Sequence, residues 1–478
     1  MSPNNVIAVD LDGTLTLTDT LHESVLLLVR NKPFMLLMLP FWLAKGLAFF
    51  KVKVAENSQL DVTTVPYNEP LIDWLRNEKA SGKKIVLCSA TNERIALAVA
   101  EHLQLFDDVM ASDAITNLKN VNKRKALEKK YGVKGYDYAG NSSADIEVWA
   151  GSRQAIVVNA SPKVHAQATQ VAPVSQIFPS HSVTISDWLR ALRIHQWLKN
   201  MLLFAPLLAA HQLGNIQSLS TLVLAFISFS LCASSVYIAN DLLDLESDRR
   251  HPRKRNRPFA AAKLPIVLGA VLSPLLVVAS LALGLMVSSD FLAVLILYFL
   301  LTTVYSLVLK RIVLVDCLTL AMLFTLRIIA GAAAVSVSLS FWFMAFSVFI
   351  FLSLALVKRY AELLTQVQAG NNHAHGRGYS VTDAPLIQTL GVAAGYSSIL
   401  VLALYIRSEA VMTLYALPTA IWFAIPLLLF WISWVWLKAN RGEMHDDPIV
   451  FAFKDKASLV VAGLAAAIFV FAVNGLGS

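Results

Sequence analysis

The sequence predicts an N-terminal α/β domain followed by an all-α domain of about nine transmembrane helices. Hydrophobic residues make up 56% of the 478-residue chain and charged residues only 15%, which is too apolar for two ordinary soluble domains. Charged and apolar residues mix up to about residue 185, and long apolar runs with short polar loops follow. We therefore expect two domains, 1–182 and 183–478, that meet near Ser182.

The charge and cysteine content exclude several classes of protein. The formal net charge is +8, but much of the basic excess lies in loops beside apolar segments, so we expect membrane orientation and no nucleic-acid partner. Cys88, Cys232 and Cys317 lie in apolar stretches without CxxC spacing, which indicates neither disulfides nor a zinc site. Acidic residues such as Asp10 and Asp12 interrupt the N-terminus, so no signal peptide is expected and the first domain should stay in the cytoplasm.

Polar residues follow each predicted strand of the first domain. The strand at 6–9 leads into Asp10-Leu-Asp12-Gly-Thr, and a second strand at 84–88 ends in Ser89. Open α/β sheets place their sites at these carboxyl ends. Further along the chain come Lys123 and the segment 138–145, which holds Asn141 and Asp145. In order and spacing these residues resemble the haloacid dehalogenase superfamily of phosphohydrolases, which implies a Rossmann-like fold.

The resemblance implies a role for each of these side chains. Asp10 would be the nucleophile that accepts a phosphoryl group, and Asp12 the acid that protonates the leaving oxygen and later activates water. Ser89 and Lys123 would stabilise the negative charge, with Lys125 as an alternative to Lys123. Magnesium would bind to Asp10, Asp12, Asn141 and Asp145. Asn141 stands where the family usually has an acid, so a catalytically silent domain stays open as an alternative.

A cap is predicted between the first two motifs, at about residues 20–80. Its apolar stretch at 35–50 is interrupted by Pro40, Lys45 and Gly46 and is short for a membrane span. It is expected either to lie in the membrane interface, where the phosphatase-like site would meet a lipid-linked substrate, or to pack on its own domain.

The second domain consists of apolar segments of helical length, because only helices satisfy the backbone in lipid. The expected spans are roughly 197–212, 219–240, 263–287, 290–309, 312–335, 340–357, 385–406, 411–437 and 457–475. Basic residues gather in alternate loops, most densely at 249–257. This asymmetry predicts an integral protein of the inner (cytoplasmic) membrane with a cytoplasmic N-terminal domain and an external C-terminus.

An acidic motif, NDxxDxxxD, stands at the cytoplasmic end of the second span. Its polar residues are Asn240, Asp241, Asp244 and Asp248. If the helix continues, they project to one side. Carboxylates that converge beside lipid repel one another unless a cation lies among them, so the motif favours magnesium with a diphosphate over a solvated acidic helix end.

This motif resembles the first aspartate-rich motif of the UbiA superfamily of intramembrane prenyltransferases, over roughly residues 186–478. The second motif of that family is matched only by Tyr305, Lys310 and a single aspartate, Asp316, as a further metal ligand. Three segments, 193–200, 358–362 and 446–451, resemble one branch, the polyprenyl-phosphate phosphoribosyltransferases.

The branch resemblance implies that phosphoribosyl diphosphate binds through magnesium to Asp241, Asp244 and Asp248 and that a polyprenyl phosphate attacks the ribose. The residues implied in substrate binding are Arg193, Lys199, Asn200, Asn240, Tyr305, Lys310, Lys358, Arg359 and Arg377. The N-terminal domain is then predicted to remove the 5-phosphate from the lipid-linked product.

Two other functions remain open. A UbiA-type prenyltransferase would use the same acids to ionise a prenyl diphosphate, with an aromatic or other acceptor. A non-catalytic membrane anchor or transporter for a soluble phosphatase is the alternative outside enzymology. The sequence gives no indication of oligomeric state.

Overall fold

The computed structural model describes residues 5–113, 117–212, 214–368, 378–407, 415–444 and 447–474. The chain divides into two compact units. The first comprises Met1–Leu192 and Tyr237–Ser273, and the second comprises Arg193–Val236 and Pro274–Ser478. We call the part of the first unit that ends with Phe178 the N-terminal domain.

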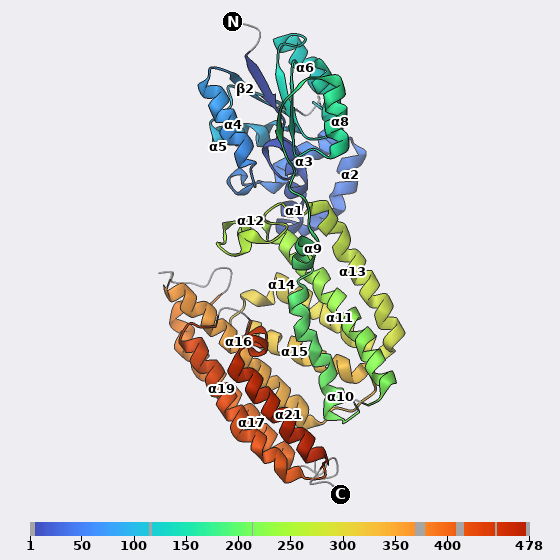
Figure 1. The fold of residues 1–478 in the computed structure, drawn as a ribbon, viewed down its shortest axis with the longest axis vertical. Helices are drawn as coiled ribbons and strands as arrows, with labels where there is room; N and C mark the ends of the chain where they lie inside the picture. Colours follow the sequence, from blue (N-terminus) through green and yellow to red (C-terminus); the bar gives the residue numbers. More distant parts are fainter. Residues whose placement is uncertain are drawn as a thin grey trace. The chain divides into compact units, whose positions relative to one another are not determined.

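A parallel six-stranded sheet, in the order β3-β2-β1-β4-β5-β6, forms the N-terminal domain (Figure 1). Its strands are β1 (Val6–Val9), β2 (Lys84–Asn92), β3 (Asp108–Ser112), β4 (Asp137–Gly140), β5 (Ala155–Val158) and β6 (Val174–Phe178). At the end of β1, Val9 pairs with Leu87 of β2 and with Ala139 of β4. The carboxyl ends of these three strands therefore meet at one edge of the sheet.

Helices cover both faces of this sheet, because successive side chains of a buried parallel strand point to opposite sides. Ile7 and Val9 pack with the helices α4 and α5, whereas Ala8 packs with α6, α7 and α8. These helices are α4 (Glu69–Ala80), α5 (Glu93–Leu103), α6 (Val121–Tyr131), α7 (Ile146–Gly151) and α8 (Pro162–Val171). The core thus lies in two apolar layers that fix the positions of the strand ends.

The cap between β1 and β2 is helical. It consists of α1 (Thr20–Asn31), a short helical segment at Pro33–Met38, α2 (Leu39–Ala44) and α3 (Leu47–Ser58). Gly46 separates α2 from α3 with a φ of 106°, a conformation that residues with a Cβ rarely adopt. The predicted apolar stretch is therefore not one helix but runs through three helical segments.

The cap carries an exposed apolar surface. Phe34 is 86% exposed, Leu37 74% and Phe41 66%. We call these residues, together with Leu43, the cap face. An exposed apolar face of this kind is unusual on a protein that is surrounded by water alone. The side chains of the cap face do not pack on the N-terminal domain.

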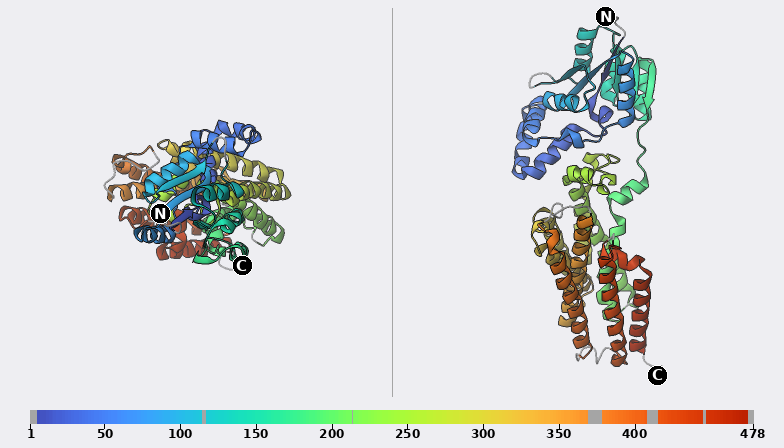
Figure 2. Two further views of the ribbon diagram at one scale, coloured as in Figure 1. Left: turned by 90° about the horizontal axis from the view of Figure 1, so that it is seen from above. Right: turned by 90° about the vertical axis from the view of Figure 1, so that its left-hand side faces the viewer.

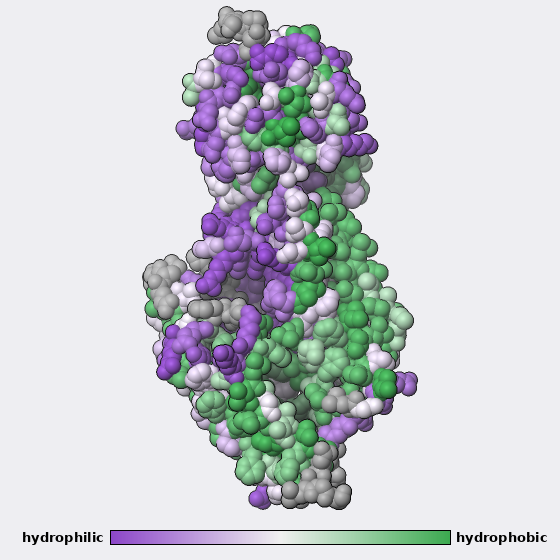
Figure 3. Space-filling view, in the orientation of Figure 1, coloured by the Kyte–Doolittle hydropathy of each residue, from purple (hydrophilic) through white to green (hydrophobic). Residues whose placement is uncertain are grey.

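Eight helices in the described part of the chain are long and apolar enough to cross a membrane. They are Ile216–Leu243 (α11), Ile266–Val287 (α13), Ser289–Leu307 (α14), Val315–Ala334 (α15), Phe341–Gln368 (α16), Ala384–Ile406 (α17), Ala424–Asn440 (α19) and Lys456–Asn474 (α21). Helices α16, α17, α19 and α21 run alongside one another (Figure 2). The visible face of the helical region is largely hydrophobic, whereas that of the N-terminal domain is largely hydrophilic (Figure 3).

The predicted first span, 197–212, is not one membrane helix, and this part of the prediction is wrong. The chain forms tight helical turns at Ile194–Phe204 and then the short helix α10 (Ala205–Ala209). Pro206 lies in the first turn of α10, where its missing N–H prevents a continuous helical hydrogen-bond pattern. The predicted span 411–437 begins within residues 411–414, which lie outside the described residues.

Small residues let the central helices approach closely. Helix α15 is the most enclosed of these eight helices, with 72% of its apolar stretch buried. A Cβ on Gly331 of α15 would lie 2.0 Å from the carbonyl oxygen of Leu203. Glycine at this position therefore allows the turns at Ile194–Phe204 to pack directly on α15.

Three further short helices lie between the larger elements, and the last two carry or adjoin polar residues considered below. They are α9 (Ile185–Ala191), α12 (Leu245–Arg250) and α20 (Pro448–Lys454).

Candidate active sites

The first candidate site lies at the carboxyl ends of β1, β2 and β4. Asp10 follows β1 directly, and its N–H donates to the carbonyl of Ala139 at the end of β4. Gly13 has a φ of 73°, and a Cβ there would lie 2.1 Å from Asn141 Nδ2. Glycine is therefore required where the Asp10 loop meets the loop that carries Asn141.

Asp10 and Asp145 share a basic partner. Lys123 Nζ lies 2.8 Å from Asp10 Oδ1 and 3.8 Å from Asp145 Oδ1. The same ammonium donates to the hydroxyl of Tyr138 at 2.8 Å, and this hydroxyl donates to Asp145 Oδ1. Lys125, one helical step away, is exposed, so geometry selects Lys123 as the lysine of this site.

Asp12 has a separate set of partners. Its Oδ1 accepts hydrogen bonds from the N–H and the hydroxyl of Thr20, both at 2.8 Å, and its Oδ2 accepts one from Thr91. The N–H of Thr91 in turn donates to the Ser89 hydroxyl at 3.0 Å. Ser89 is fully buried and is linked to Asp12 through Thr91.

The acidic end of the segment 138–145 is held by its own loop. Asp145 Oδ2 accepts from the N–H groups of Asn141 and Ser142 and from the Ser142 hydroxyl, at 3.0 to 3.1 Å. These bonds fix the carboxylate beside Asp10. The structure thus brings together all six residues that the sequence predicts for this site: Asp10, Asp12, Ser89, Lys123, Asn141 and Asp145.

The pKa values of Asp10, Asp12 and Lys123 are all raised, through a balance of burial and neighbouring charges. Burial raises the pKa of Asp10 to about 7, although the Lys123 ammonium opposes the shift. Burial and the nearby Asp19 also raise the pKa of Asp12. Burial lowers the pKa of Lys123, but the Asp10 and Asp145 carboxylates outweigh it and the net pKa is raised. Asp12 therefore holds a proton more readily than an exposed carboxyl does.

A pocket opens beside Asp12. Its polar lining includes Asp19, Thr91 and Lys51 of the cap helix α3. Burial lowers the pKa of Lys51, whose ammonium donates to the carbonyl of Ala90 at 2.6 Å. The cap thus places a basic side chain in the pocket beside Asp12.

The second candidate site is the acidic motif at the end of α11. The Asp244 N–H donates to the Asn240 carbonyl at 2.9 Å, and the Asp248 N–H to the Asp244 carbonyl at 2.8 Å. Helical hydrogen bonds therefore run through the join between α11 and α12. Asp241 and Asp248 are 2% and 1% exposed, whereas Asn240 and Asp244 are half-buried.

Asp241 and Asp248 converge on one nitrogen atom. Arg257 Nη1 lies 3.0 Å from Asp241 Oδ1 and 2.6 Å from Asp248 Oδ2. Burial raises the pKa of Asp248, and Arg257 opposes this shift. Sequence reasoning did not select Arg257, although the basic loop at 249–257 was a signal that a cation lies close to the acids.

Both acidic centres offer oxygen ligands that suit magnesium. Within the described ranges, no group of three or more His, Cys, Asp or Glu side chains could by itself hold a metal ion. Each centre instead has two carboxylates that converge on one cationic nitrogen. Magnesium is commonly bound by one or two carboxylates together with substrate phosphates, so the donor sets fit that ion with a phosphorylated ligand.

A third polar cluster lies in the second unit. Asp447, which caps α20, accepts hydrogen bonds from Lys199 at 2.7 Å and from Lys358 of α16 at 3.3 Å. Although burial opposes it, these two ammonium groups hold the pKa of Asp447 well below its ordinary value. The structure thus joins two predicted substrate-binding lysines through Asp447. This aspartate lies in the segment 446–451 but was not predicted as a site residue.

Asp316 and Arg359 form a fully buried ion pair. Arg359 Nη2 lies 2.6 Å from Asp316 Oδ2, and Tyr379 donates to Asp316 Oδ1 at 2.5 Å. Both side chains have no exposed surface. This packing differs from the predicted roles of Asp316 as a metal ligand and Arg359 as a substrate ligand, because each charge is already neutralised inside the helical core.

Asn200 likewise serves an internal network. Its amide donates to the Ser230 hydroxyl at 2.9 Å, and its carbonyl accepts from Arg327 at 2.9 Å. Asn200 is only 1% exposed, so the observed partners are protein groups where substrate contact was predicted. The other predicted ligands Arg193, Tyr305 and Lys310 are half-buried, and Arg377 lies outside the described residues.

Comparisons with known proteins bear on both domains. The UbiA prenyltransferase family matches residues 201–456. The uncharacterized protein y4nM of Sinorhizobium fredii is 34% identical over 467 residues, which cover 97% of this chain and 90% of that protein. The decaprenyl-phosphate phosphoribosyltransferase of Mycolicibacterium smegmatis is 31% identical over 282 residues, 57% of this chain and 87% of that protein.

Among solved structures, a UbiA homolog from Archaeoglobus fulgidus bound to GPP and Mg²⁺ is similar, with a TM-score of 0.46 and 15% identity; it covers 59% of this chain and 99% of that one. A phosphoserine phosphatase in apo form is similar to the N-terminal domain, with a TM-score of 0.28 and 16% identity, over 37% of this chain and 93% of that one. Since the family match extends over more than half of the chain and includes the acidic motif, the chain belongs to the UbiA prenyltransferase family.

Proposed function

We propose that this chain transfers a 5-phosphoribosyl group from phosphoribosyl diphosphate to a polyprenyl phosphate. The observation that carries the proposal is the convergence of Asp241 and Asp248 on one cationic nitrogen, since that geometry suits a metal-bound diphosphate. The choice of ribosyl donor and lipid acceptor is supported by the likeness to the decaprenyl-phosphate phosphoribosyltransferase.

The chemistry requires only that a leaving group departs and a charged lipid attacks. The bond between ribose C1 and the diphosphate breaks, and a phosphate oxygen of the lipid forms a new bond to C1. The lipid phosphate is already anionic, so no general base is required. At both acidic centres, bound magnesium would supply positive charge that neutralises the phosphate oxygens.

Each polar residue of the transferase has a place in this proposal. Asp241, Asp244 and Asp248 would hold the metal, and Asn240 orients the motif. Lys199 and Lys358 hold a phosphate group, and Asp447, which pairs with both ammonium groups, holds them close together. Arg193, Lys310 and Tyr305 contact the donor.

The N-terminal domain is proposed to remove the 5-phosphate from the product. The Asp10 carboxylate attacks phosphorus while Asp12 gives its proton to the departing oxygen, and Asp12 then takes a proton from the water that releases the phosphate. The raised pKa of Asp12 supports its role as an acid. With Asn141 in the place of an acid, a silent domain is the alternative.

The membrane setting is part of the proposal. We place the protein in the inner (cytoplasmic) membrane with its N-terminal domain in the cytoplasm, because the basic residues gather in alternate loops. The exposed cap face would lie in the membrane interface, where a phosphatase can reach a phosphate on a lipid.

Prenyl transfer is the second candidate function, favoured by the family to which the chain belongs. The test offers purified protein in nanodiscs two substrate pairs: phosphoribosyl diphosphate with polyprenyl phosphate, and prenyl diphosphate with an aromatic acid. We expect diphosphate release and a ribosylated lipid from the first pair only. Asp241→Ala should lower that turnover by about a hundredfold or more, since it removes a ligand of the leaving group.

Release from the second pair alone would replace our choice by prenyl transfer. An Asp241→Ala rate equal to that of the wild type would support the non-catalytic alternative.

A further inference from the structure

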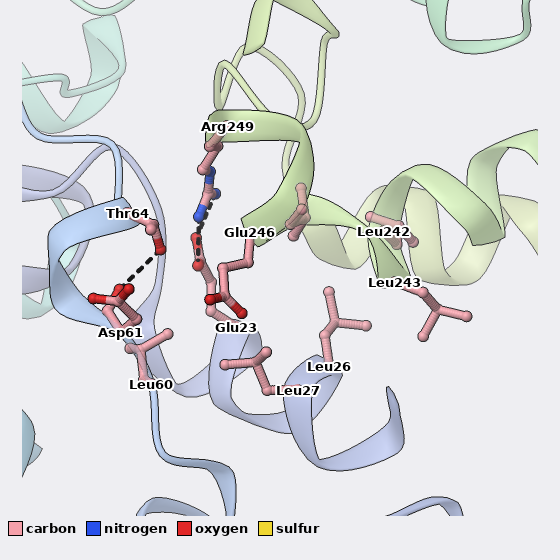
Figure 4. A pocket seen from close by; sticks show the side chains of 11 residues that line it. Glu23, Leu26, Leu27, Leu60, Asp61, Thr64, Leu242, Leu243, Glu246 and Arg249 are labelled. Carbon is pink, nitrogen blue, oxygen red and sulfur yellow. Dashed lines mark hydrogen bonds and ion pairs between the residues drawn. The ribbon is translucent and has the colours of Figure 1, made fainter. Parts of the chain in front are cut away.

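Helix α1 of the cap contacts the residue that follows the acidic motif (Figure 4). Arg249, next to Asp248, donates from Nη1 to Glu23 Oε2 and from Nη2 to Glu23 Oε1, each at 2.7 Å. The two side chains are only 8% and 4% exposed. This paired arrangement fixes the guanidinium in both distance and orientation.

The same guanidinium also holds the turn that follows α12. Arg249 Nε donates to the carbonyl of Ala260 at 3.0 Å. That turn carries Arg257, whose Nη1 bridges Asp241 and Asp248. Glu23 therefore anchors Arg249, which links the end of α12 to the turn that carries Arg257.

The surroundings of this contact are largely apolar. Leu26 and Leu27 of α1 face Leu242 and Leu243 in the pocket beside the ion pair (Figure 4). Low exposure strengthens the attraction and makes an unpaired Arg249 unfavourable. The loss of Glu23 would thus shift the arginine and not merely leave it in place.

We propose that Glu23 of the N-terminal domain is a positioning residue for the acidic motif: it holds Arg249, and through Arg249 it sets the spacing of Asp241 and Asp248 for the metal-bound diphosphate. This inference rests on the proposed function of the motif. Thr20, at the start of the same helix, donates to Asp12, so α1 contacts one acidic centre directly and reaches the other through Arg249.

The test is a magnesium titration of diphosphate release by the full chain in nanodiscs. Glu23→Gln preserves shape and removes the charge, so the half-saturating Mg²⁺ concentration should rise by about tenfold or more, as for other residues that orient metal ligands. Turnover at saturating Mg²⁺ should return close to that of the wild type, because every ligand remains. Glu23→Asp, which keeps the charge, should recover part of the shift.

Asp61→Asn is the matched control. It removes the neighbouring ion pair between Asp61 and Arg250, which also links the cap to α12. This pair is more exposed than Glu23–Arg249, with Asp61 32% and Arg250 58% exposed. Its titration should match that of the wild type.

Three outcomes separate the possibilities. If the wild type releases no diphosphate at any Mg²⁺ concentration, the proposed function fails. If the wild type is active and Glu23→Gln titrates as it does, the positioning role is overturned. Should Glu23→Gln not fold, Arg249→Lys keeps the charge and removes the paired bonds, and a wild-type titration of that variant overturns the role equally.

Discussion

At the scale of the residue, the two acidic centres use the same device. Asp10 and Asp145 converge on Lys123, and Asp241 and Asp248 converge on Arg257. Two buried carboxylates repel each other, and the attraction of both to a shared cation offsets that repulsion. The pairing keeps the two carboxyl groups of each centre converged, which is the arrangement that a divalent cation and a phosphate need.

The lysine of the N-terminal domain gives a residue-scale prediction. Lys123→Met should lower phosphatase turnover of a phosphorylated lipid by about a hundredfold or more, because it removes the charge beside the phosphoryl group. Lys125→Met, one step away on an exposed position of α6, should change turnover little. Phosphate release measured for both variants checks this, and an equal loss in the two would contradict the assignment of Lys123.

The partners of individual charges are what the sequence did not reveal. Asp447 lies far along the chain from Lys199, and Arg359 lies far from Asp316. Such pairs depend on how the helices pack, and a motif read along the chain contains no information on that packing. Asp316 was predicted as a metal ligand from its resemblance to the second family motif, and the structure pairs it with the buried Arg359.

At the scale of the element, periodicity and length predicted most of the membrane helices and two of the six strands of the sheet. The strands at 6–9 and 84–88 are present, and long apolar runs such as Val315–Ala334 form helices of membrane length. The exceptions are segments with a local helix breaker, Pro206 in the predicted first span and Gly46 in the cap. In these segments hydropathy correctly indicated an apolar run but not its shape.

The cap face gives an element-scale prediction. A polarity-sensitive fluorophore on Phe34→Cys, in the full chain in nanodiscs, should be quenched by brominated lipids, because the exposed cap face would lie among acyl chains. Val133→Cys is the matched control, since Val133 is also apolar and is 69% exposed but lies outside the cap. Equal quenching at the two positions, or none at Phe34→Cys, would contradict insertion of the cap.

At the scale of the whole molecule, one chain combines a membrane domain of the UbiA prenyltransferase family with an N-terminal α/β domain. Each part holds a pair of carboxylates on one cationic group, and α1 contacts both Asp12 of the first centre and Arg249, which follows Asp248 of the second. A fusion of this kind would let one protein make a lipid-linked phosphate ester and then hydrolyse it.

Binding of Mn²⁺ to the full chain in nanodiscs, followed by electron paramagnetic resonance in the presence of phosphoribosyl diphosphate, tests the central claim most directly. The account predicts a bound Mn²⁺ that depends on the diphosphate, that persists in Asp10→Asn/Asp145→Asn, and that is lost in Asp241→Asn/Asp248→Asn. A diphosphate-dependent signal that is unchanged in Asp241→Asn/Asp248→Asn would contradict it.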